Sequence, residues 1–350
     1  MSEPNIFPLH ALTDWALPSH GLRVETIDAH VGGQSLRVIL KGVPPLVGKT
    51  MPERWEYAKK HFDHLRRSLL FEPRGHPEMA GCLLTPPQHR GSHCGALFLH
   101  RGGFSPMCGH GIIALSTILL ERGMVEMKAP ETRLRIDTPA GTVRAFGAVV
   151  DDRVERVFFE NVPSRVIAAN QRLTVPGRGE VRYDLVYAGA LLALVEAEAV
   201  GVYTGAEAAV AAAAAGVELL QLLTGPAAKA ATDYPLFGVV LRGVPLRRRQ
   251  GGADLRQVCV FADGCVDRSA GGLALCARLA LLAHEGEIEE GVSLTAEGIT
   301  GSSLKGRIVG WDPDGKSGGV ICEVEGQAWI TGRHTFLIAA DDPFRSGFLL

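Results

Sequence analysis

The chain has 350 residues, of which 46% are hydrophobic, and a formal net charge of −2 at pH 7. This length allows two domains, or one large domain with an ample core. The nearly balanced charge favours neither nucleic acid nor an acidic membrane surface as a partner. Glu196, Glu198 and Glu207 interrupt the longest apolar stretches, and the N-terminus lacks a basic start followed by an apolar run. We therefore expect no membrane span, no signal peptide and a cytoplasmic protein.

In chain order, the first half predicts a loose arm over residues 1–20 and then a series of strands and helices. Residues 22–40 alternate as strands do, with a break at His30-Val31-Gly32-Gly33, and residues 53–70 have the pattern of a charged amphipathic helix. A second helix begins at Cys108 and stops at Gly123. Further strands are expected around residues 79–86, 95–101, 133–137, 142–150 and 154–159.

The second half predicts strands at residues 165–175, 181–187 and 256–262, and an alanine-rich helix at 205–223. The basic segment 245–252 is interpreted as a solvated hairpin tip, with phosphate binding as the alternative. Another apolar helix is opened by Asp267-Arg268-Ser269-Ala270-Gly271-Gly272, and short strands end the chain. We expect an N-terminal half over residues 1–160, completed by residues 335–350, and a C-terminal half over residues 161–334.

Residues 105–111, Ser-Pro-Met-Cys-Gly-His-Gly, precede an apolar run with helical spacing. Ser105 is the expected cap and Pro106 suits the first turn. Cys108 then lies at the positive end of a helix, where the pKa of a thiol can fall from about 8.5 to roughly 3.5–7.5. Gly109 and Gly111 leave the backbone open, so that a carboxylate could bind the same N–H groups. The alternative is an inert, buried cysteine.

The two glycine-opened helices can be aligned with each other. Both segments run from a small polar turn through an apolar helix to a glycine of equal spacing. The aligned pairs are Cys108 with Gly271, Gly109 with Gly272, Ala114 with Ala277, and Gly123 with Gly286. This internal repeat predicts two similar α/β halves, each presenting a helix N-terminus to a shared cleft.

The seven cysteines are scattered, odd in number and without a CxxC pair, which argues against disulfides and structural zinc. A metal site at Cys108 and His110 would need further ligands, so we expect none. Cys276 lies five residues past Gly271, about 140° around the helix, and should point into the core. Cys265 is interpreted as structural. The others, Cys82, Cys94, Cys259 and Cys322, are expected to be small buried apolar residues.

Several motifs in this order resemble the proline racemase superfamily. They are residues 27–33 (Ile-Asp-Ala-His-Val-Gly-Gly), 63–67 (Asp-His-Leu-Arg-Arg), 72–76 (Glu-Pro-Arg-Gly-His), 105–111, 137–141 (Asp-Thr-Pro-Ala-Gly), 267–269 (Asp-Arg-Ser) and 297–301 (Glu-Gly-Ile-Thr-Gly). The resemblance implies an α/β (α+β) fold of the diaminopimelate-epimerase type, in which each half has a β-sheet wrapped around a central helix. The active site would lie in the cleft between the halves.

The resemblance also implies a cofactor-free enzyme that acts at the α-carbon of proline or hydroxyproline. Cys108 would exchange the α-proton, and Asp267 would pair with the ring nitrogen. The substrate carboxylate would lie on the N–H groups of Gly109, His110, Gly272 and Leu273. We also expect the His110 side chain to line the site, and His30 and His76 to support the cleft.

Two departures from the family pattern bear on the reaction. Racemases and epimerases of the family begin the second helix with another Cys, and its trans-3-hydroxyproline dehydratases usually have Thr there, whereas this chain has Gly271. Because glycine carries no proton, inversion by two bases is impaired. Leu273 stands where the family usually has a small hydroxyl residue, which puts the detail of carboxylate binding in question.

Three functions stay open. The first, which we favour, is dehydration of trans-3-hydroxy-L-proline to Δ1-pyrroline-2-carboxylate by a single cysteine base, a hydro-lyase reaction. The second is a proline racemase or 4-hydroxyproline epimerase with a non-standard second acid. The third is a non-catalytic protein that binds a proline analogue. All three imply a small imino acid as ligand, neither cofactor nor metal, and allow a homodimer.

Overall fold

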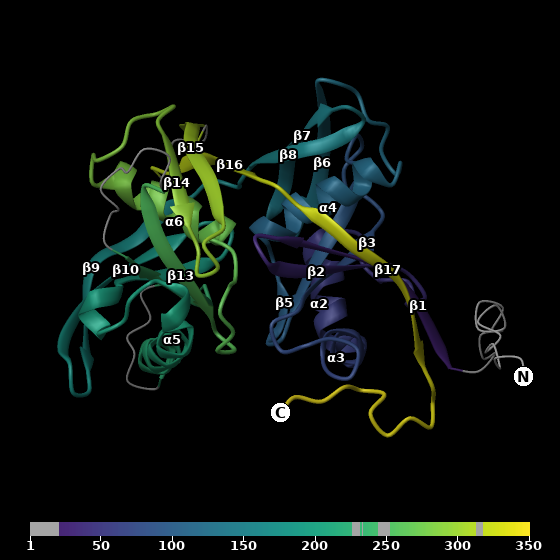
Figure 1. Cartoon of the computed structure of the whole chain (residues 1–350), viewed down its shortest axis with the longest axis horizontal. Coiled ribbons are helices and arrows are strands. Elements are labelled where there is room, and N and C mark those ends of the chain that lie inside the picture. Colours follow the sequence, from purple (N-terminus) through teal and green to yellow (C-terminus); the bar gives the residue numbers. More distant parts are fainter. Residues whose placement is uncertain (1–20, 226–231, 233, 244–252, 313–317) are drawn as a thin grey trace, which may run out of the picture.

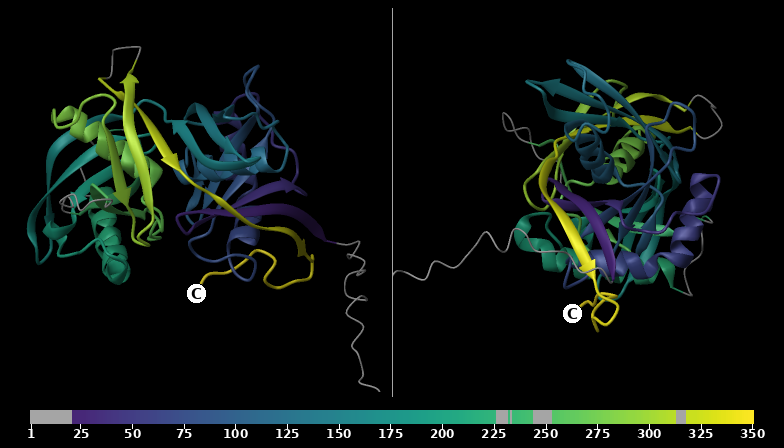
Figure 2. Two further views of the ribbon diagram at one scale, coloured as in Figure 1. Left: turned by 45° about the horizontal axis from the view of Figure 1, so that its top comes forward. Right: turned by 90° about the vertical axis from the view of Figure 1, so that its right-hand side faces the viewer.

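The computed structural model describes residues 21–225, 232, 234–243, 253–312 and 318–350, and it forms two α/β lobes that lie side by side (Figure 1). A helix lies within each lobe, α4 (Gly109–Glu121) in the first and α6 (Gly272–His284) in the second. Strand pairing passes from one lobe to the other through β8 (Arg153–Glu160) and β16 (Val320–Gly326), which are antiparallel. In the turned views of Figure 2, the yellow C-terminal strand crosses from the second lobe back to the first.

In the first lobe the strands pair in the order β17-β1-β2-β3-β4-β6-β7-β8, and short β5 adds to β4. The pairs β2–β3 and β4–β6 are parallel and the others antiparallel. The bounds are β1 (Leu22–Val31), β2 (Gln34–Lys41), α2 (Met51–His61), α3 (Asp63–Leu70), β3 (Ala80–Thr85), β4 (Cys94–His100), β5 (Gly103–Ser105), β6 (Glu131–Thr138), β7 (Gly141–Val150) and β17 (Trp329–Ile338).

The second lobe repeats this arrangement, with strands in the order β9-β10-β11-β12-β13-β14-β15-β16 and parallel pairs at β11–β12 and β13–β14. Each strand therefore has a counterpart in the first lobe, and β17 takes the place that β9 has in the second. The bounds are β9 (Arg165–Val175), β10 (Gly179–Tyr187), β11 (Leu191–Glu196), η1 (Ala197–Val200), η2 (Ala206–Ala208), α5 (Ala209–Thr224), β12 (Leu236–Arg242), β13 (Leu255–Phe261), β14 (Ser293–Glu297) and β15 (Ser303–Trp311).

The C-terminal strand sets where the chain returns to the first lobe. Strand β17 pairs with β1 from Trp329 opposite His30 to Ile338 opposite Leu22. This pairing begins before residue 335, where the sequence analysis placed the return. We therefore propose two halves divided at residue 160, with the first half completed from Trp329 onward.

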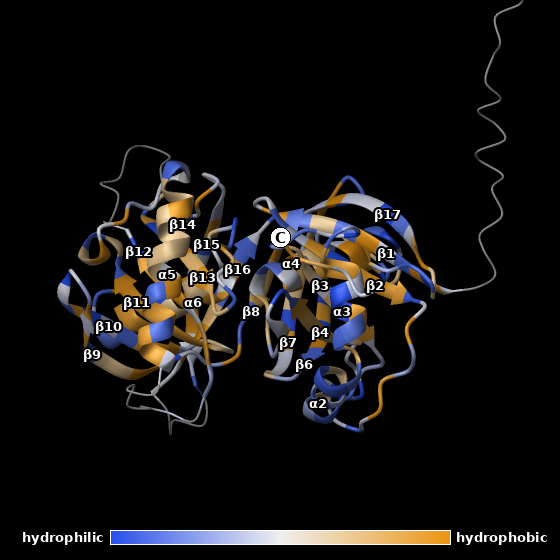
Figure 3. Cartoon of the chain, turned by 90° about the horizontal axis from the view of Figure 1, so that it is seen from below, coloured by the Kyte–Doolittle hydropathy of each residue, from blue (hydrophilic) through white to orange (hydrophobic). Residues whose placement is uncertain are grey.

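Both central helices are enclosed by strands. Helix α4 packs against β1, β2, β3, β7, β8 and β17, and α6 against β9, β10, β11, β15 and β16. A helix that is apolar on all sides, as these are, belongs in a core; in Figure 3 the strands β11 and β12 are largely orange, whereas the outer helix α2 is largely blue. Each helix is followed by a glycine with positive φ, Gly123 at 66° and Gly286 at 75°. None of the described helices is long and apolar enough to span a membrane.

The structure corrects several local predictions. The expected helix at 53–70 is two helices, because Phe62, with φ −114° and ψ 9°, interrupts it. Ser105 does not cap α4: its hydroxyl bonds the backbone of Met107, and the N-cap is Cys108. The alanine-rich helix α5 begins at Ala209, after a short 3₁₀ turn. The expected arm at residues 1–20 and the basic segment 245–252 lie outside the described residues.

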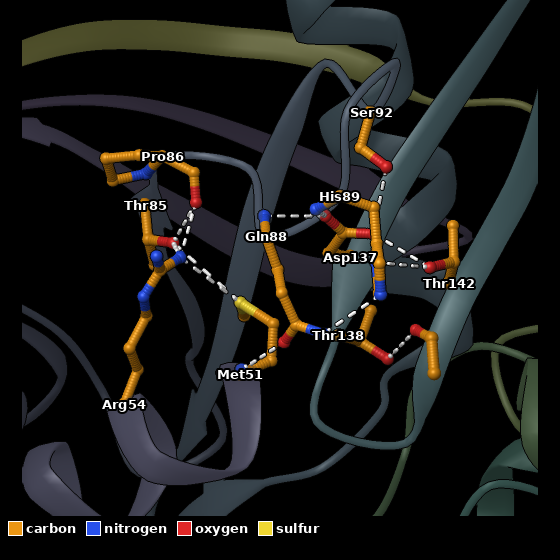
Figure 4. A network of polar contacts seen from close by, with 11 residues as sticks. Met51, Arg54, Thr85, Pro86, Gln88, His89, Ser92, Asp137, Thr138 and Thr142 are labelled. Atoms are coloured by element: carbon orange, nitrogen blue, oxygen red, sulfur yellow. Dashed lines mark hydrogen bonds and ion pairs between the residues drawn. The ribbon is translucent and has the colours of Figure 1, made fainter. Parts of the chain in front are cut away.

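Asp137, at the end of β6, is a buried carboxylate that holds the loop after β3 (Figure 4). It accepts hydrogen bonds from the backbone of Gln88 and His89 at 2.8 and 3.0 Å, and from the side chains of His89, Ser92 and Thr142 at 2.8–3.0 Å. Burial alone would raise the pKa of Asp137, but the bonds from His89, Thr142 and Ser92 hold it well below its usual value. This residue from the 137–141 motif is therefore structural.

The depressed pKa of Asp137 predicts acid sensitivity. A carboxyl group with a lower pKa in the folded state contributes stability above its unfolded pKa, and that stability is lost as the pH falls toward the folded pKa. We expect Asp137→Asn to lower the free energy of unfolding by about 1–3 kcal/mol at pH 7. Between pH 5 and pH 3, the free energy of unfolding of this variant should fall less than that of the wild type. Urea midpoints at these pH values measure both effects. Equal pH dependence of the two proteins would contradict the assignment.

Candidate active site

A cleft between the lobes contains about 680 Å³ of empty space, including the part open to solvent. All seven residues that were predicted from the sequence to be catalytic or substrate-binding line this cleft. From the first lobe these are Cys108, Gly109 and His110, and from the second Asp267, Gly271, Gly272 and Leu273. Their roles in binding or catalysis stay predictions, but the structure brings them together.

The two central helices meet at their N-termini, backbone against backbone. A methyl group on Gly109 would lie 2.8 Å from Gly272 Cα, and one on Gly272 would lie 3.0 Å from Gly109 Cα. Real side chains do not approach a backbone this closely, so both positions need glycine. The contact places the first turns of α4 and α6 at one end of the cleft.

The N–H groups of these first turns are the groups of the cleft that could bind an anion. The earliest bonds within the helices come from Ile112 to the Cys108 carbonyl and from Leu275 to the Gly271 carbonyl, at 3.0 and 2.9 Å. The preceding N–H groups of each helix, as at any helix start, have no acceptor within the helix. Two such sets, together with the positive ends of two helix dipoles, form a cradle for a carboxylate.

Cys108 is half-buried at the start of α4, and its Sγ lies 3.5 Å from both ring nitrogens of His110. Burial raises the pKa of Cys108 to about 12, the Gly111 N–H opposes this change, and the charge of Asp267 adds to it. The predicted fall in the pKa of Cys108 is therefore wrong, because desolvation outweighs the effect of the helix start. Burial also lowers the pKa of His110, whereas the charge of Asp267 raises it.

Asp267 is buried and has one oxygen available to the cleft. Its Oδ1 accepts two bonds of 2.8 Å, from the backbone N–H and the hydroxyl of Ser269. Among the described residues its Oδ2 has no hydrogen-bond donor, and it lies 3.5 Å from where a Cβ on Gly271 would be. Burial raises the pKa of Asp267, whereas His110 and the Ser269 bonds lower it. An oxygen placed in this way suits a cationic ring nitrogen.

Gly271 caps α6 with φ 75°, a conformation that side chains rarely adopt. A Cβ there would also lie 3.0 Å from the Cβ of Ala274. The α4 residue that corresponds to Ala274 is Gly111, where a methyl group would lie 3.0 Å from the Cys108 sulfur. Gly111 therefore leaves space for the Cys108 thiol in the first lobe, whereas the Ala274 methyl group fills the corresponding space in the second lobe.

The sequence analysis missed other residues of the cleft. Gln34 and Glu78 line it; Gln34 Nε2 bonds the Glu78 carbonyl at 2.8 Å, and Arg268 bonds both residues. His100 and Asp263, from different lobes, form a pair at 3.2 Å. Of these residues, only Gln34 could have been found from the sequence, because it directly follows the 27–33 motif.

The structure places three cysteines and two histidines differently with respect to the cleft. Cys265 and Cys259 both line the cleft, although Cys259 had been expected only as a buried apolar residue, and Cys276 does not line it. His76 bonds Ser35 at 3.3 Å and lies 3.5 Å from Glu78, so it supports the cleft, whereas His30 stacks on Trp329 outside the lining. Among the described residues, no three His, Cys, Asp or Glu side chains are grouped to hold a metal ion.

Comparison with known proteins gives the class. The model of the proline racemase family matches residues 26–349, and the chain belongs to this family. The curated relatives named trans-3-hydroxy-L-proline dehydratase include one from Bacillus thuringiensis subsp. konkukian, which is 37% identical, and one from Homo sapiens, which is 38% identical. Each alignment covers 93% of this chain, and 97% and 94% of the relatives respectively.

Solved structures of the family have the same fold. A hydroxyproline epimerase from Agrobacterium vitis, with bound trans-4-hydroxy-L-proline, superposes with a TM-score of 0.88 at 28% identity, covering 95% of this chain and 96% of that one. A probable proline racemase from Agrobacterium radiobacter, with bound carbonate, gives 0.87 at 29%, covering 93% and 96%. More distant proteins of the phenazine-biosynthesis PhzF family share the sheet-rich α/β fold alone, with a TM-score of 0.57 at 14% identity.

The glycine contact predicts a steric penalty. We expect Gly109→Ala to force the two helix starts apart and to destabilise the protein by about 1–3 kcal/mol, as overpacking does. Thermal unfolding measures this change. Gly310→Ala is the matched control, because a methyl group there meets no atom within 4 Å. Equal effects of the two substitutions would contradict the contact.

The raised pKa of Cys108 predicts that its thiol reacts slowly with alkylating reagents at neutral pH. Because the thiolate is the nucleophile, alkylation by iodoacetamide should rise roughly tenfold for each pH unit up to about pH 10. Mass spectrometry of the labelled peptide gives the rate at Cys108, and Cys108→Ser reveals labelling elsewhere. A plateau by pH 8 would show a thiol that is already ionised.

Proposed function

We propose that the protein removes water from trans-3-hydroxy-L-proline, with Cys108 as the base. The observation that carries this proposal is the asymmetry of the two helix starts: α4 begins at a thiol, and α6 begins at Gly271, which has no side chain. An elimination needs only one proton carrier, whereas inversion at carbon needs one on each face. The two relatives at 37% and 38% identity that carry the dehydratase name support the same reaction.

The charges of the cleft match those of an imino acid zwitterion. The substrate carboxylate would lie on the N–H groups of the two first turns, namely those of Gly109, His110, Gly272 and Leu273. The ring nitrogen would pair with Asp267 Oδ2, the oxygen with no described donor. The α-carbon is bonded to both groups, so this placement holds it between the helix starts and beside Cys108. Negative charge that develops on the carboxylate during proton removal is then stabilised by fixed dipoles.

The stereochemistry of the substrate allows the Cys108 thiol to act also as the acid that protonates the leaving hydroxyl group. In the trans isomer the carboxylate and hydroxyl lie on opposite faces of the ring, so the α-hydrogen and the hydroxyl share a face. The Cys108 thiolate takes the α-proton, and the electron pair of that C–H bond forms the double bond between the α- and β-carbons. The C–O bond then breaks, and the new thiol returns its proton to the departing oxygen, which leaves as water. The enamine product tautomerises to Δ1-pyrroline-2-carboxylate.

Substrate binding also favours the thiolate. The charge of Asp267 contributes to the raised pKa of Cys108. A bound ring cation neutralises that charge, which lowers the pKa of Cys108 from its raised value. The proposed reaction draws only on groups of this chain and needs no cofactor. A cytoplasmic location and a homodimer stay predictions.

The test is turnover of trans-3-hydroxy-L-proline, detected with an imine-trapping reagent. We expect product with the wild type, and a loss of about 100- to 10,000-fold in Cys108→Ser, the usual range for removal of a general base. Cys94→Ala, a buried cysteine outside the cleft lining, is the control and should retain activity. The cis-3 isomer should yield no product, because its α-hydrogen and hydroxyl lie on opposite faces.

Other outcomes would refute the proposal. Full activity of Cys108→Ser would remove the cysteine from the reaction. Equal turnover of the cis and trans isomers would contradict the shared-face mechanism. Binding of hydroxyproline by calorimetry, with no turnover of any isomer, would indicate a non-catalytic binding protein.

A further inference from the structure

The turn between β1 and β2 reaches from the first lobe to the second. Gly32 and Gly33 form this turn, both with positive φ, at 56° and 87°. The Gly32 carbonyl accepts a hydrogen bond of 3.1 Å from the Ser302 hydroxyl of the second lobe, and a methyl group on Gly32 would collide with that hydroxyl. The turn therefore packs directly on the second lobe, and Gln34, which follows it, lies at the junction.

Gln34 joins the two lobes through both ends of its amide, and it is 2% exposed. Its Oε1 accepts a hydrogen bond of 2.9 Å from the backbone N–H of Arg268 in the second lobe, and its Nε2 donates one of 2.8 Å to the Glu78 carbonyl in the first. A primary amide suits this pair of partners, because it offers an acceptor and a donor side by side. Loss of the amide would leave a buried N–H and a buried carbonyl unpaired, which is unfavourable.

The bond from Arg268 holds the turn that carries Asp267. Asp267 directly precedes Arg268, and within the second lobe its backbone N–H bonds the Cys259 carbonyl at 2.9 Å. Its carboxylate is held at one oxygen, because Oδ1 accepts both bonds from Ser269, whereas Oδ2 has no donor among the described residues. The direction of Oδ2 therefore follows the backbone of the turn, and Gln34 holds this backbone from the first lobe.

The other polar contacts described between this turn and the first lobe are more exposed. Arg268 and Glu78 form an ion pair of 3.2 Å, but their side chains are 37% and 32% exposed, and such pairs contribute little. The Thr300 hydroxyl lies 2.9 Å from the Arg268 carbonyl and 3.0 Å from the Gly32 carbonyl, and its single hydrogen is shared between them. Gln34 provides the buried link.

We propose that Gln34 is a positioning residue, which sets Asp267 Oδ2 at the place where it pairs with the ring nitrogen of an imino acid. This inference rests on that pairing in the proposed function. Cys108 belongs to the first lobe and Asp267 to the second, so the distance between base and carboxylate depends on how the lobes are joined. Gln34 acts through the backbone of Arg268 and not on the reacting atoms.

Calorimetry with two ligands tests the inference. L-Proline and cyclopentanecarboxylate share a carboxylate on a five-membered ring, but L-proline alone carries the ring nitrogen, and it has no hydroxyl to eliminate. In Gln34→Ala we expect the affinity for L-proline to fall about tenfold or more, the range for loss of a hydrogen bond to a charged group. The affinity for cyclopentanecarboxylate should stay near that of the wild type, because its carboxylate would still lie on the helix starts.

Two further variants separate the hydrogen bonds from packing. Gln34→Met fills a similar volume without an amide, so it should weaken L-proline binding as Gln34→Ala does. In Asp267→Asn, replacement of Gln34 should lower the L-proline affinity little further, because both residues act through one interaction. Asn161→Ala is the matched control: it removes a buried amide that bonds the Ala188 carbonyl at 2.9 Å outside the cleft lining, and it should bind both ligands as the wild type does.

Three results would overturn the inference: unchanged L-proline affinity in Gln34→Ala and Gln34→Met, equal weakening of both ligands, or an undiminished further loss in Asp267→Asn. If Asp267→Asn alone bound L-proline as the wild type does, the pairing of Asp267 with the ring nitrogen would be refuted, and the inference with it. The expected ligand pattern in a protein that does not turn over trans-3-hydroxy-L-proline would refute the proposed dehydration and support the role of Gln34.

Discussion

Two helix N-termini meet through the backbones of Gly109 and Gly272, and this contact constrains the rest of the cleft. Each start carries roughly half a positive charge, so bringing two together is unfavourable unless an anion joins them. Apolar packing in the cores of the lobes, where strands surround α4 and α6, offsets this unfavourable contact. In the proposed reaction the cleft is therefore preorganised for the substrate carboxylate, and the negative charge that develops at the α-carbon would meet dipoles that need not reorient.

Much of this arrangement was predictable from local patterns. The motif at Cys108 and the glycine spacing of the second helix predicted two matching helix starts, because a helix N-terminus is determined by a few adjacent residues. The equal order of strands in the two lobes follows the same repeat. The return of β17 was placed too late, since pairing of Trp329 with His30 joins residues at opposite ends of the chain.

The electrostatic prediction failed for a physical reason. A helix start lowers the pKa of a thiol in solvent, but the pKa of Cys108 is raised to about 12 by the burial that the two lobes impose together. Burial of this kind depends on contacts across the cleft, and no local pattern reports it. The same limit explains why the pair of His100 and Asp263 was missed: it lines the cleft only after strands and loops far apart in sequence have packed.

The difference between the lobes is the structural basis of the elimination that we propose. Gly111 leaves space for the Cys108 sulfur, whereas the Ala274 methyl fills the equivalent space beside Gly271. A cysteine placed at 271 would meet that methyl and would also have to adopt a φ of 75°, so one substitution cannot restore symmetry. The proposed elimination needs no proton from that side, because its leaving group departs on the Cys108 face.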